Sequence, residues 1–597
     1  MENSNDSSYF KRRKLVIFQI LENLMVLDLH GCFNLTSVPD LSGHRALEKL
    51  VLERCEKLTK IHESVGSLSS LLHLNLRNCS NLIELPSDVS GLKQLESLIL
   101  SCCTKINKLP ESIGHMKSLK ELLLDETAIA TLPDYIFRLT NLERLSLNGC
   151  KLLKRLPQFI GKLCSLKELS LNHSTLEEIP DSIGSLEDLE KLSLMCCKSL
   201  NRIPDSIGNL KSLSSFFING TVIKQLPWSI GLLSNLKHLL VGENHFLSKL
   251  PDSIEGLDSI VELKMDGTSI IDLPDKIGDL KVIQKLDMKK CESLRSLPES
   301  IGHMWTLTTL IISKANISAM PESIGMLENL IELRLDECKQ LRKLPTSIGN
   351  LKSLQQLLMN ETAVTDLPES FVMLSSLMVL KMAKKPHVEL LDKSTPEVPV
   401  ICSTIEKRKV FELPTSFSNL SLLSEFDACA FEICGKIPDD FEKLSSLEIL
   451  RLGHNHFCKL PSSLMGLSIL KQLILPDCKE LKSLPPLPSS LVKVNVANCI
   501  ALESVSDLSN LESLRDLNLT NCEKVVDIPG LQKLKSLRWL YMSNCNACSS
   551  SVKRRLSKVL SLSLSLSLSL SLTILYSTFK KLKRKRFELL IPFGRFL

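Results

Sequence analysis

The sequence of 597 residues predicts an α/β horseshoe solenoid, with a parallel β-sheet on its concave face and short helical or 3-10 turns on its convex face. Three observations predict it. A pattern of leucines restarts every 23 or 24 residues, each restart holds a Leu-x-Leu core of period two, and a proline-led segment follows that core. The composition agrees, because the chain is 44% hydrophobic but only 4% aromatic, and its glycine and proline contents are too low for collagen-like or wholly disordered chains.

The repeats follow the pattern Leu-x-x-Leu-x-Leu-x-x-Cys/Asn/Thr, whose positions are numbered here as places 1 to 9. About 22 of them are recognisable, with place 1 at residues 24, 47, 71, 95, 119, 142, 166, 189, 213, 236, 260, 283, 307, 330, 354, 377, 423, 447, 470, 491, 514 and 537. From 95 to 377 the spacing alternates between 24 and 23 residues, and the residue at place 9 alternates with it. A double unit of 47 residues is therefore the unit that was duplicated.

Each repeat is expected to form one coil. The leucines at places 4 and 6 alternate with polar residues, as in a short strand with one buried face, and successive strands stack into a parallel sheet. Place 9 is expected to turn inward, where a small side chain bonds backbone groups left unpaired by the turn. This structural ladder consists of Cys55, Cys79, Cys103, Thr127, Cys150, Cys197, Thr221, Asn244, Thr268, Cys291, Cys338, Thr362, Asn455, Cys478, Cys499, Cys522 and Cys545.

The convex half of the coil has the form Leu-Pro-x-Ser-Ile-Gly-x-Leu, whose Pro-x-Ser-Ile-Gly part is seen in residues 110–114 and 204–208. Proline followed by an acidic residue and serine favours a tight 3-10 turn whose isoleucine points into the core. Together these features predict a leucine-rich-repeat horseshoe solenoid.

The domain organisation follows from where the pattern holds. We expect an N-terminal basic tail and partial cap (1–20), leucine-rich repeats (21–385), a degenerate repeat with a polar loop (386–412), further repeats (413–548) and a disordered Leu-Ser and basic tail (549–597). The polar loop is either a decayed repeat or a specific contact or hinge. The Leu-Ser alternation from 560 to 572 is what a translated dinucleotide repeat gives, so we expect the tail to be non-native read-through.

Charge is segregated along the chain. The net charge of +6 combines +2 in residues 1–14, +10 in residues 553–597 and −6 in the body between them. An acidic body gives no reason to expect nucleic acid as a partner. The serines of the C-terminal run make a membrane anchor the less favoured alternative to a disordered tail, and we expect no membrane partner.

No pattern for catalysis, cofactor binding or metal binding is present. The histidines are scattered, and twelve of the 20 cysteines recur at place 9, which indicates packing rather than disulfides or metal ligation. We therefore expect no enzyme, no cofactor and no metal.

Four features of the sequence resemble a single protein family. They are residues 24–39 (LMVLDLHGCFNLTSVP), residues 40–55 (DLSGHRALEKLVLERC), the frequent cysteine at place 9, and residues 435–446 (GKIPDDFEKLSS). They are similar to the leucine-rich-repeat region of plant TIR-NBS-LRR disease-resistance receptors of the tobacco mosaic virus resistance protein N type. The resemblance implies a cytosolic immune receptor whose repeats sense a pathogen effector and restrain an ATP/ADP switch. Because no Gly-x-x-x-x-Gly-Lys-Ser/Thr loop occurs, nucleotide binding and TIR activity are not carried over.

The concave face is the expected binding surface, because places 3, 5, 7 and 8 alternate with the buried leucines. Candidate protein-binding residues there are Arg54, Arg77, Leu123, Asp125, Glu126, Phe217, Lys289, Lys290, Arg334, Asp336, Glu337, Lys381, Lys384, Trp539 and Tyr541. Aromatic and arginine side chains are the types most often found at binding hot spots.

The exposed sheet surface predicts protein recognition, and the resemblance implies that the module is autoinhibitory and acts in plant innate immunity and defence signalling. Its expected partner is a pathogen effector, a guarded host protein or the nucleotide-binding domain of a receptor. A stand-alone intracellular scaffold of the Ras-group-like leucine-rich-repeat type is the alternative. We expect a cytoplasmic location, with the nucleus as an alternative because residues 11–14 and 580–586 resemble import signals. Ends without caps predict self-association.

Overall fold

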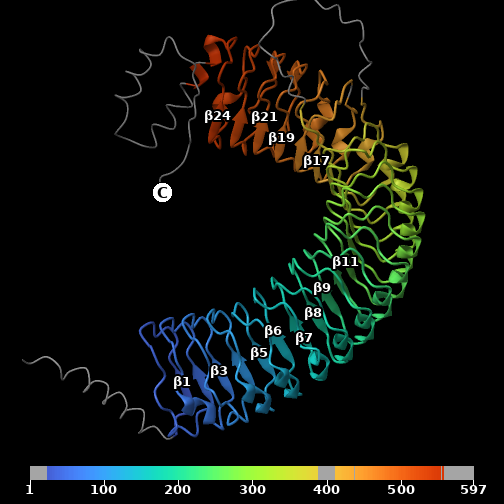
Figure 1. Ribbon diagram of the computed structural model, residues 1–597. Coiled ribbons are helices and arrows are strands. Elements are labelled where there is room, and N and C mark those ends of the chain that lie inside the picture. The colour runs from blue at the N-terminus through green and yellow to red at the C-terminus, as the bar shows by residue number, and fades with distance from the viewer. Residues whose placement is uncertain (1–22, 387–410, 436, 553, 557–597) are drawn as a thin grey trace, which may run out of the picture. The chain divides into compact units, whose positions relative to one another are not determined.

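The computed structural model describes residues 23–386, 411–435, 437–552 and 554–556. The chain divides into two compact units, unit 1 (Met1–Leu307) and unit 2 (Thr308–Leu597). Each unit is a stack of coils, and each coil contributes one short strand to a parallel sheet and, in most cases, one 3-10 helix to the opposite side (Figure 1).

Unit 1 contains a parallel sheet in which each strand pairs with the strand of the next coil. The strands are β1 (Val26–Asp28), β2 (Lys49–Val51), β3 (His73–Asn75), β4 (Ser97–Ile99), β5 (Glu121–Leu123), β6 (Arg144–Ser146), β7 (Glu168–Ser170), β8 (Lys191–Ser193), β9 (Ser215–Phe217), β10 (His238–Leu240), β11 (Glu262–Lys264) and β12 (Lys285–Asp287). The register sets place 4 of one coil beside place 4 of the next, as in Leu27 beside Leu50.

Unit 2 continues the same pairing within itself. Its strands are β13 (Thr309–Ile311), β14 (Glu332–Arg334), β15 (Gln356–Leu358), β16 (Val379–Lys381), β17 (Glu425–Asp427), β18 (Ile449–Arg451), β19 (Gln472–Ile474), β21 (Lys493–Asn495), β23 (Asp516–Asn518) and β24 (Trp539–Tyr541). A separate short pair joins β20 (Ser483–Leu484) to β22 (Ser504–Val505).

The other side of each stack carries 3-10 helices. Unit 1 has η1 (Glu63–Ser67), η2 (Glu111–His115), η3 (Asp134–Arg138), η4 (Ile160–Lys162), η5 (Asp181–Ser185), η6 (Asp205–Asn209), η7 (Trp228–Leu232), η8 (Asp252–Gly256), η9 (Asp275–Asp279) and η10 (Glu299–His303). Unit 2 has η11 (Glu322–Met326), η12 (Thr346–Asn350), η13 (Glu369–Met373), η14 (Phe417–Asn419), η15 (Phe441–Lys443), η16 (Ser462–Gly466) and η17 (Leu531–Lys533).

The repeat pattern explains both sides of the coil. In β5 the leucine at place 4, Leu122, is fully buried while its neighbours at places 3 and 5 are only partly buried. In η2, Pro110 precedes the helix with an extended backbone, Ile113 is buried, and the N–H of Met116 closes the turn on the carbonyl of Ile113. The predicted α/β solenoid of parallel strands and 3-10 turns is confirmed.

β16 and β17 are neighbours in the sheet although residues 382–424 separate them in the chain. Val379 pairs directly with Glu425, so no strand stands between these two coils. Most of the segment expected to be a degenerate repeat with a polar loop, 386–412, lies outside the described residues, as do residues 1–22 and 557–597, which hold the basic and Leu-Ser tails.

The start of the predicted disordered tail is a correction. Residues 550–552 and 554–556 are helical, Val552 is buried, and the guanidinium of Arg555 lies 2.6 Å from a carboxylate oxygen of Asp527. The N–H of Ser549 also bonds the carbonyl of Val526. The buried Val552 and the contacts to Val526 and Asp527, in the repeat that starts at 514, order this segment. The nearby Leu-Ser run concealed that signal.

Candidate protein-interaction surface

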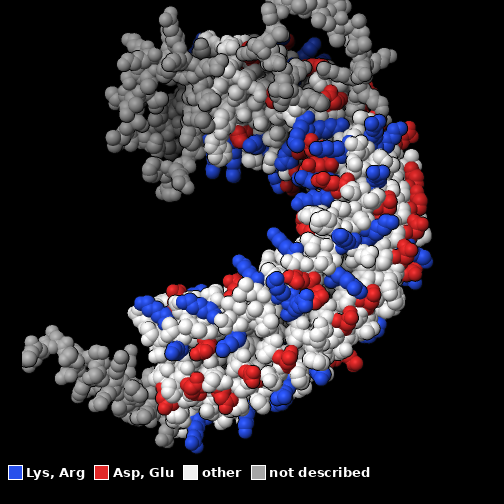
Figure 2. Space-filling model, viewed as in Figure 1, with Lys and Arg blue, Asp and Glu red and all other residues white. Residues whose placement is uncertain are grey.

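The solvent side of each sheet, hereafter the sheet face, is built from places 3, 5, 7 and 8 of the repeats. In strands such as β5 and β11 only the central side chain is buried, and the first and third side chains stand on the opposite side. In β6, β7, β8 and β12 the third side chain is buried as well. Places 7 and 8 follow in the turn after the strand. This is the surface that the sequence predicts to be concave, and Figure 2 shows that Lys, Arg, Asp and Glu are interspersed on the molecular surface in view.

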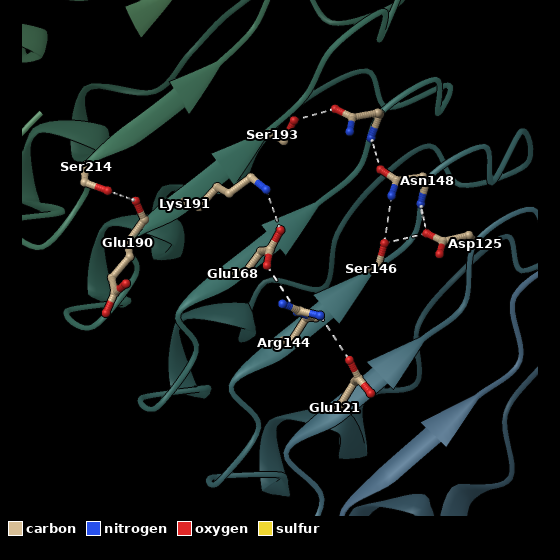
Figure 3. Close-up of polar contacts among 11 residues, drawn as sticks. Glu121, Asp125, Arg144, Ser146, Asn148, Glu168, Glu190, Lys191, Ser193 and Ser214 are labelled. Carbon is tan, nitrogen blue, oxygen red and sulfur yellow. Dashed lines mark hydrogen bonds and ion pairs between the residues drawn. The ribbon is translucent and has the colours of Figure 1, made fainter. Parts of the chain in front are cut away.

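A row of alternating charges crosses the sheet face of unit 1 at place 3 (Figure 3). The guanidinium of Arg144 lies 3.2 Å from a carboxylate oxygen of Glu121 and 3.1 Å from one of Glu168. The ammonium of Lys191 lies 2.8 Å from the other carboxylate oxygen of Glu168. Sequence reasoning missed this row because it selected residues repeat by repeat, whereas these side chains alternate between repeats.

The row resumes at the last strands of unit 1. Glu262 lies 2.9 Å from the ammonium of Lys285 and 3.5 Å from the imidazole of His238. Although burial acts in the opposite direction, the hydrogen bond and charge from Lys285 hold the pKa of the Glu262 carboxyl below its usual range. These pairs neutralise much of the charge on the sheet face.

Asp125 accepts hydrogen bonds from several neighbours (Figure 3). The Ser101 hydroxyl at 3.0 Å, the Ser146 hydroxyl and the backbone N–H of Asn148 at 2.9 Å all donate to it. A carboxylate held by three donors from the two flanking coils fixes the turns that follow the strands. The neighbouring candidates Leu123 and Glu126 are partly buried and exposed, respectively.

The other candidate residues differ in their exposure to solvent and in whether neighbouring side chains pair with them. Exposed side chains are those of Arg54, Arg77, Lys289, Lys290, Arg334 and Trp539, and partly buried ones are those of Phe217, Asp336, Glu337, Lys381, Lys384 and Tyr541. Ion pairs join Lys290 to Glu243 at 3.6 Å, Glu337 to Lys314 at 3.1 Å, Lys381 to Glu425 at 3.2 Å and Arg334 to Glu332 at 2.5 Å, and Asp336 accepts hydrogen bonds from Asn360. Within the described residues, the side chains of Arg54 and Arg77 have no hydrogen bond or ion pair.

Lys384 is less accessible than the sequence predicts. Its ammonium donates to the carbonyl of Val364 at 2.8 Å and lies 4.6 Å from the ring centroid of Phe431. Burial lowers the pKa of this amine. Phe431 belongs to the next coil of the stack, which includes β17. Because Phe431 lies far from Lys384 along the chain, the sequence pattern did not predict this contact.

Place 9 faces the core, and its side chains link consecutive coils. Cys103 is buried, and its thiol donates to the carbonyl of Leu76, 27 residues earlier, at 3.1 Å. The same contact recurs with carbonyl acceptors in the preceding coil at Cys55, Cys79, Cys150, Cys197, Cys291, Cys338, Cys478, Cys499, Cys522 and Cys545. Of these, Cys545 in the last coil is only partly buried, and all cysteines of the described residues are free thiols.

Where threonine or serine alternates with cysteine, the two side chains meet. The hydroxyl of Thr127 donates to the carbonyl of Leu124 at 2.8 Å and lies 3.4 Å from the sulfur of Cys150. Thr268 and Cys291 repeat this contact at 3.3 Å. Thr362, whose next coil has no cysteine at place 9, bonds only the carbonyl of Met359 among the contacts of the described residues.

Asn244 takes the place of a cysteine and makes more bonds. Its amide nitrogen donates to the carbonyls of Ile218 and Val241 at 3.0 and 2.8 Å, and its oxygen accepts from the N–H and the hydroxyl of Thr221, both at 2.7 Å. Asn455 repeats the pattern with the carbonyls of Ala428 and Leu452, both at 2.9 Å.

Place 8 adopts a left-handed backbone along most of the array. Arg54, Glu126, Lys290 and Glu337 have φ between 53° and 60°, a region that favours glycine and asparagine. Gly149 occupies the same place with φ 69°. The recurrence of Gly and Asn at place 8 is a sequence signal that could have revealed this geometry.

Two classes of site are absent from the part of the chain that the structure describes. No group of three or more His, Cys, Asp or Glu side chains there could hold a metal ion. No helix in the same residues has the length and apolar character needed to cross a membrane.

Comparison with known proteins points to one family. A family model described as "Leucine-rich repeat region" matches residues 31–151, and one described as "Leucine Rich Repeat" matches residues 141–163. A solved leucine-rich-repeat protein of Leptospira interrogans is 32% identical, with a TM-score of 0.54 over 62% of this chain and 94% of that one.

Similarity to curated proteins is local. The chain is 41% identical over 73 residues to TMV resistance protein N of Nicotiana glutinosa and 42% identical over 72 residues to disease resistance-like protein DSC1 of Arabidopsis thaliana. Each match covers 12% of this chain and 6% of the relative. Stacked coils, a parallel sheet with a solvent-facing side and these matches together show that the chain belongs to the leucine-rich-repeat proteins, with its curated relatives among plant disease-resistance proteins.

Proposed function

We propose that this chain is a protein-recognition module of plant innate immunity that acts in the cytoplasm. Its sheet face would contact a pathogen effector or a guarded host protein, and would hold the nucleotide-binding domain of a receptor inactive. The similarity to TMV resistance protein N and disease resistance-like protein DSC1 supports the immune role.

The observation that carries the recognition role is the order of the sheet face. Neighbouring coils hold its side chains through ion pairs such as Arg144 with Glu121, so a partner meets a surface that is already organised. Arg54 and Arg77, whose side chains have no hydrogen bond or ion pair among the described residues, remain available within it. Neither matching family description names an enzyme, and we propose binding rather than catalysis.

The test is partner capture by the full chain with reversed charges on the sheet face. Arg54 and Arg77 lie on adjacent coils, where the N–H of Arg54 bonds the carbonyl of Arg77. The double variant Arg54→Glu with Arg77→Glu is expected to lose proteins that copurify with the unmodified chain from infected leaf tissue.

A matched control is Arg202→Glu with Lys224→Glu, which makes the same change of charge at exposed residues outside the sheet face. It is expected to retain those proteins. Equal capture by both double variants would contradict recognition through this surface. Autoinhibition is tested by supplying the chain in trans to an autoactive nucleotide-binding domain, where suppression of cell death is the expected result.

A further inference from the structure

A cavity of 330 Å³ opens at the starts of four neighbouring strands of unit 2, β19, β21, β23 and β24. Lys471, Lys493, Arg515, Asp516 and Trp539 line it. These residues occupy places 2 and 3 of consecutive repeats, so they lie at one edge of the sheet face. The volume falls within the range of small-ligand and peptide side-chain pockets.

The backbone around the cavity has its hydrogen bonds satisfied by neighbouring coils. The carbonyl of Lys471 accepts from the N–H groups of Val492 and Lys493, at 2.8 and 3.0 Å. The carbonyl of Arg515 accepts in the same way from Arg538 and Trp539, at 2.8 and 2.9 Å. A ligand therefore cannot insert as a strand between these coils, and within the cavity side chains must recognise it.

The charges that line the cavity favour an anion. Lys493 is paired with Asp516 at 3.0 Å, and Lys471 with Glu448 at 2.7 Å. The guanidinium of Arg515 has no hydrogen bond or ion pair in the described part of the chain. Three cations thus meet two carboxylates, which leaves the guanidinium of Arg515 as the excess charge among these described residues. A guanidinium has the planar donor geometry that matches a carboxylate in a two-bond contact.

Trp539 adds an apolar wall. Its side chain is 38% exposed, and the strand register sets Gln472, Lys493, Asp516 and Trp539 in one row. Three strand spacings span about 14 Å, which matches about four residues of extended peptide. A partly exposed indole beside a guanidinium that no described residue pairs suits a short segment that carries both an acidic and an apolar side chain.

We propose that this cavity is a docking site for an acidic linear segment of a protein partner. An aspartate or glutamate side chain of the segment pairs with Arg515, and the apolar residue next to it packs on Trp539. This inference rests on the proposed protein-recognition function and assigns one contact of that function to unit 2.

The test is fluorescence anisotropy with the full chain and a labelled pentapeptide, Gly-Asp-Leu-Glu-Gly, acetylated and amidated so that only side-chain carboxylates carry charge. Arg515→Gln and Trp539→Ala are each expected to weaken binding about tenfold or more, as expected for loss of a charge-assisted contact or an aromatic anchor. Trp539→Phe, which keeps a ring, is expected to bind more tightly than Trp539→Ala, and circular dichroism checks that each variant folds.

The controls are Arg342→Gln, with the same change of charge at an exposed residue of unit 2, and Trp228→Ala, which removes an exposed tryptophan of unit 1. Both are expected to bind the peptide as the unmodified chain does, and a peptide with Asn and Gln in place of Asp and Glu is expected to bind at least about tenfold more weakly. Equal weakening by Arg515→Gln and Arg342→Gln, tight binding of the uncharged peptide, or displacement by millimolar inorganic phosphate would each overturn the proposal.

Failure of this site is distinguishable from failure of the proposed function. If the peptide does not bind but the Arg54 and Arg77 double variant still loses its copurifying proteins, the cavity is rejected and recognition by the sheet face stands. If the peptide binds through Arg515 while no protein copurifies, the docking site stands and the wider surface is rejected.

Discussion

At the scale of single residues, the contribution of place 9 to stability depends on how many hydrogen bonds its small buried side chain makes. A cysteine at this place donates one weak bond across coils, whereas Asn244 makes four contacts that include both carbonyls and Thr221. Composition alone treats these residues as interchangeable members of one pattern. Their removal is expected to have different costs.

Asn244→Ala is expected to lower the free energy of unfolding by about 3 kcal/mol, because it leaves the buried carbonyls of Ile218 and Val241 and the N–H of Thr221 without partners. Cys150→Ala, which removes one thiol and its bond to the carbonyl of Leu124, is expected to cost about 1–2 kcal/mol. Urea titration followed by circular dichroism compares them. A smaller cost for Asn244→Ala would show that the amide contacts do not dominate.

The buried thiols also link stability to pH. Burial raises the pKa of Cys79, Cys103 and Cys522 from 9.0 to about 12, and that of Cys338 to about 11. The unfolded chain loses these protons above pH 9 while the folded chain keeps them, so stability is complete below pH 9 and falls as the pH rises toward 12.

Each such thiol is expected to cost about 1.4 kcal/mol for each pH unit in this window. Urea midpoints measured from pH 8 to 11 should fall, and the fall should be shallower in Cys103→Ser, because serine does not titrate there. Cys164→Ser, at an exposed thiol, is the control and should keep the full slope. A midpoint independent of pH would contradict the linkage.

At the scale of elements, the 3-10 turns stack because glycine leaves room for the next coil. A Cβ built on Gly161 would lie 2.1 Å from the carbonyl oxygen of Ser182, whereas one on Gly43 meets nothing within 4 Å. Gly161→Ala is expected to destabilise the chain by about 2 kcal/mol or more, because backbone rather than a flexible side chain must move. Gly43→Ala is the matched control with little effect, and thermal unfolding compares the two.

The elements also show what sequence can and cannot predict. Strands and turns repeat every 23 or 24 residues, so Leu122 in the core and Pro110 before η2 follow directly from the pattern. Contacts between coils are harder to predict from sequence. Arg144, for example, forms ion pairs with Glu121 and Glu168, which lie on the two neighbouring coils. The environment of Lys384 is still harder to predict, because the ring that covers it, Phe431, lies 47 residues later in the chain.

At the scale of the whole molecule, the last coil and the segment that follows it bear on association. Self-association through the ends of the array remains a prediction, and Val552 is buried in the helical segment that follows the last strand, β24. Val552→Asp is expected to raise the apparent mass in light scattering at micromolar concentration, because it uncovers apolar surface there. Ser550→Asp, an exposed position of the same helical segment, should leave the mass unchanged. A monodisperse Val552→Asp monomer would contradict this prediction.

The alternation of coils predicts how unit 1 tolerates deletions. Removing residues 142–165, one repeat, would set Glu121 opposite Glu168 and would leave Thr127 without Cys150. Removing residues 142–188, two repeats, would set Glu121 opposite Lys191 and Thr127 beside Cys197, which restores both contacts. The longer deletion is expected to be the more stable chain, as judged by urea midpoints, and the reverse order would contradict the pairing argument.

The same alternation constrains inheritance. Tandem arrays gain and lose copies by unequal crossing-over, and an exchange of one coil would bring like charges together on one side of the sheet and break a hydroxyl–thiol contact on the other. An exchange of two coils is free of both defects. Genes for such arrays should therefore vary in length by pairs of coils. The alternating charges of Glu121, Arg144, Glu168 and Lys191 would select against recombinants that gain or lose a single coil.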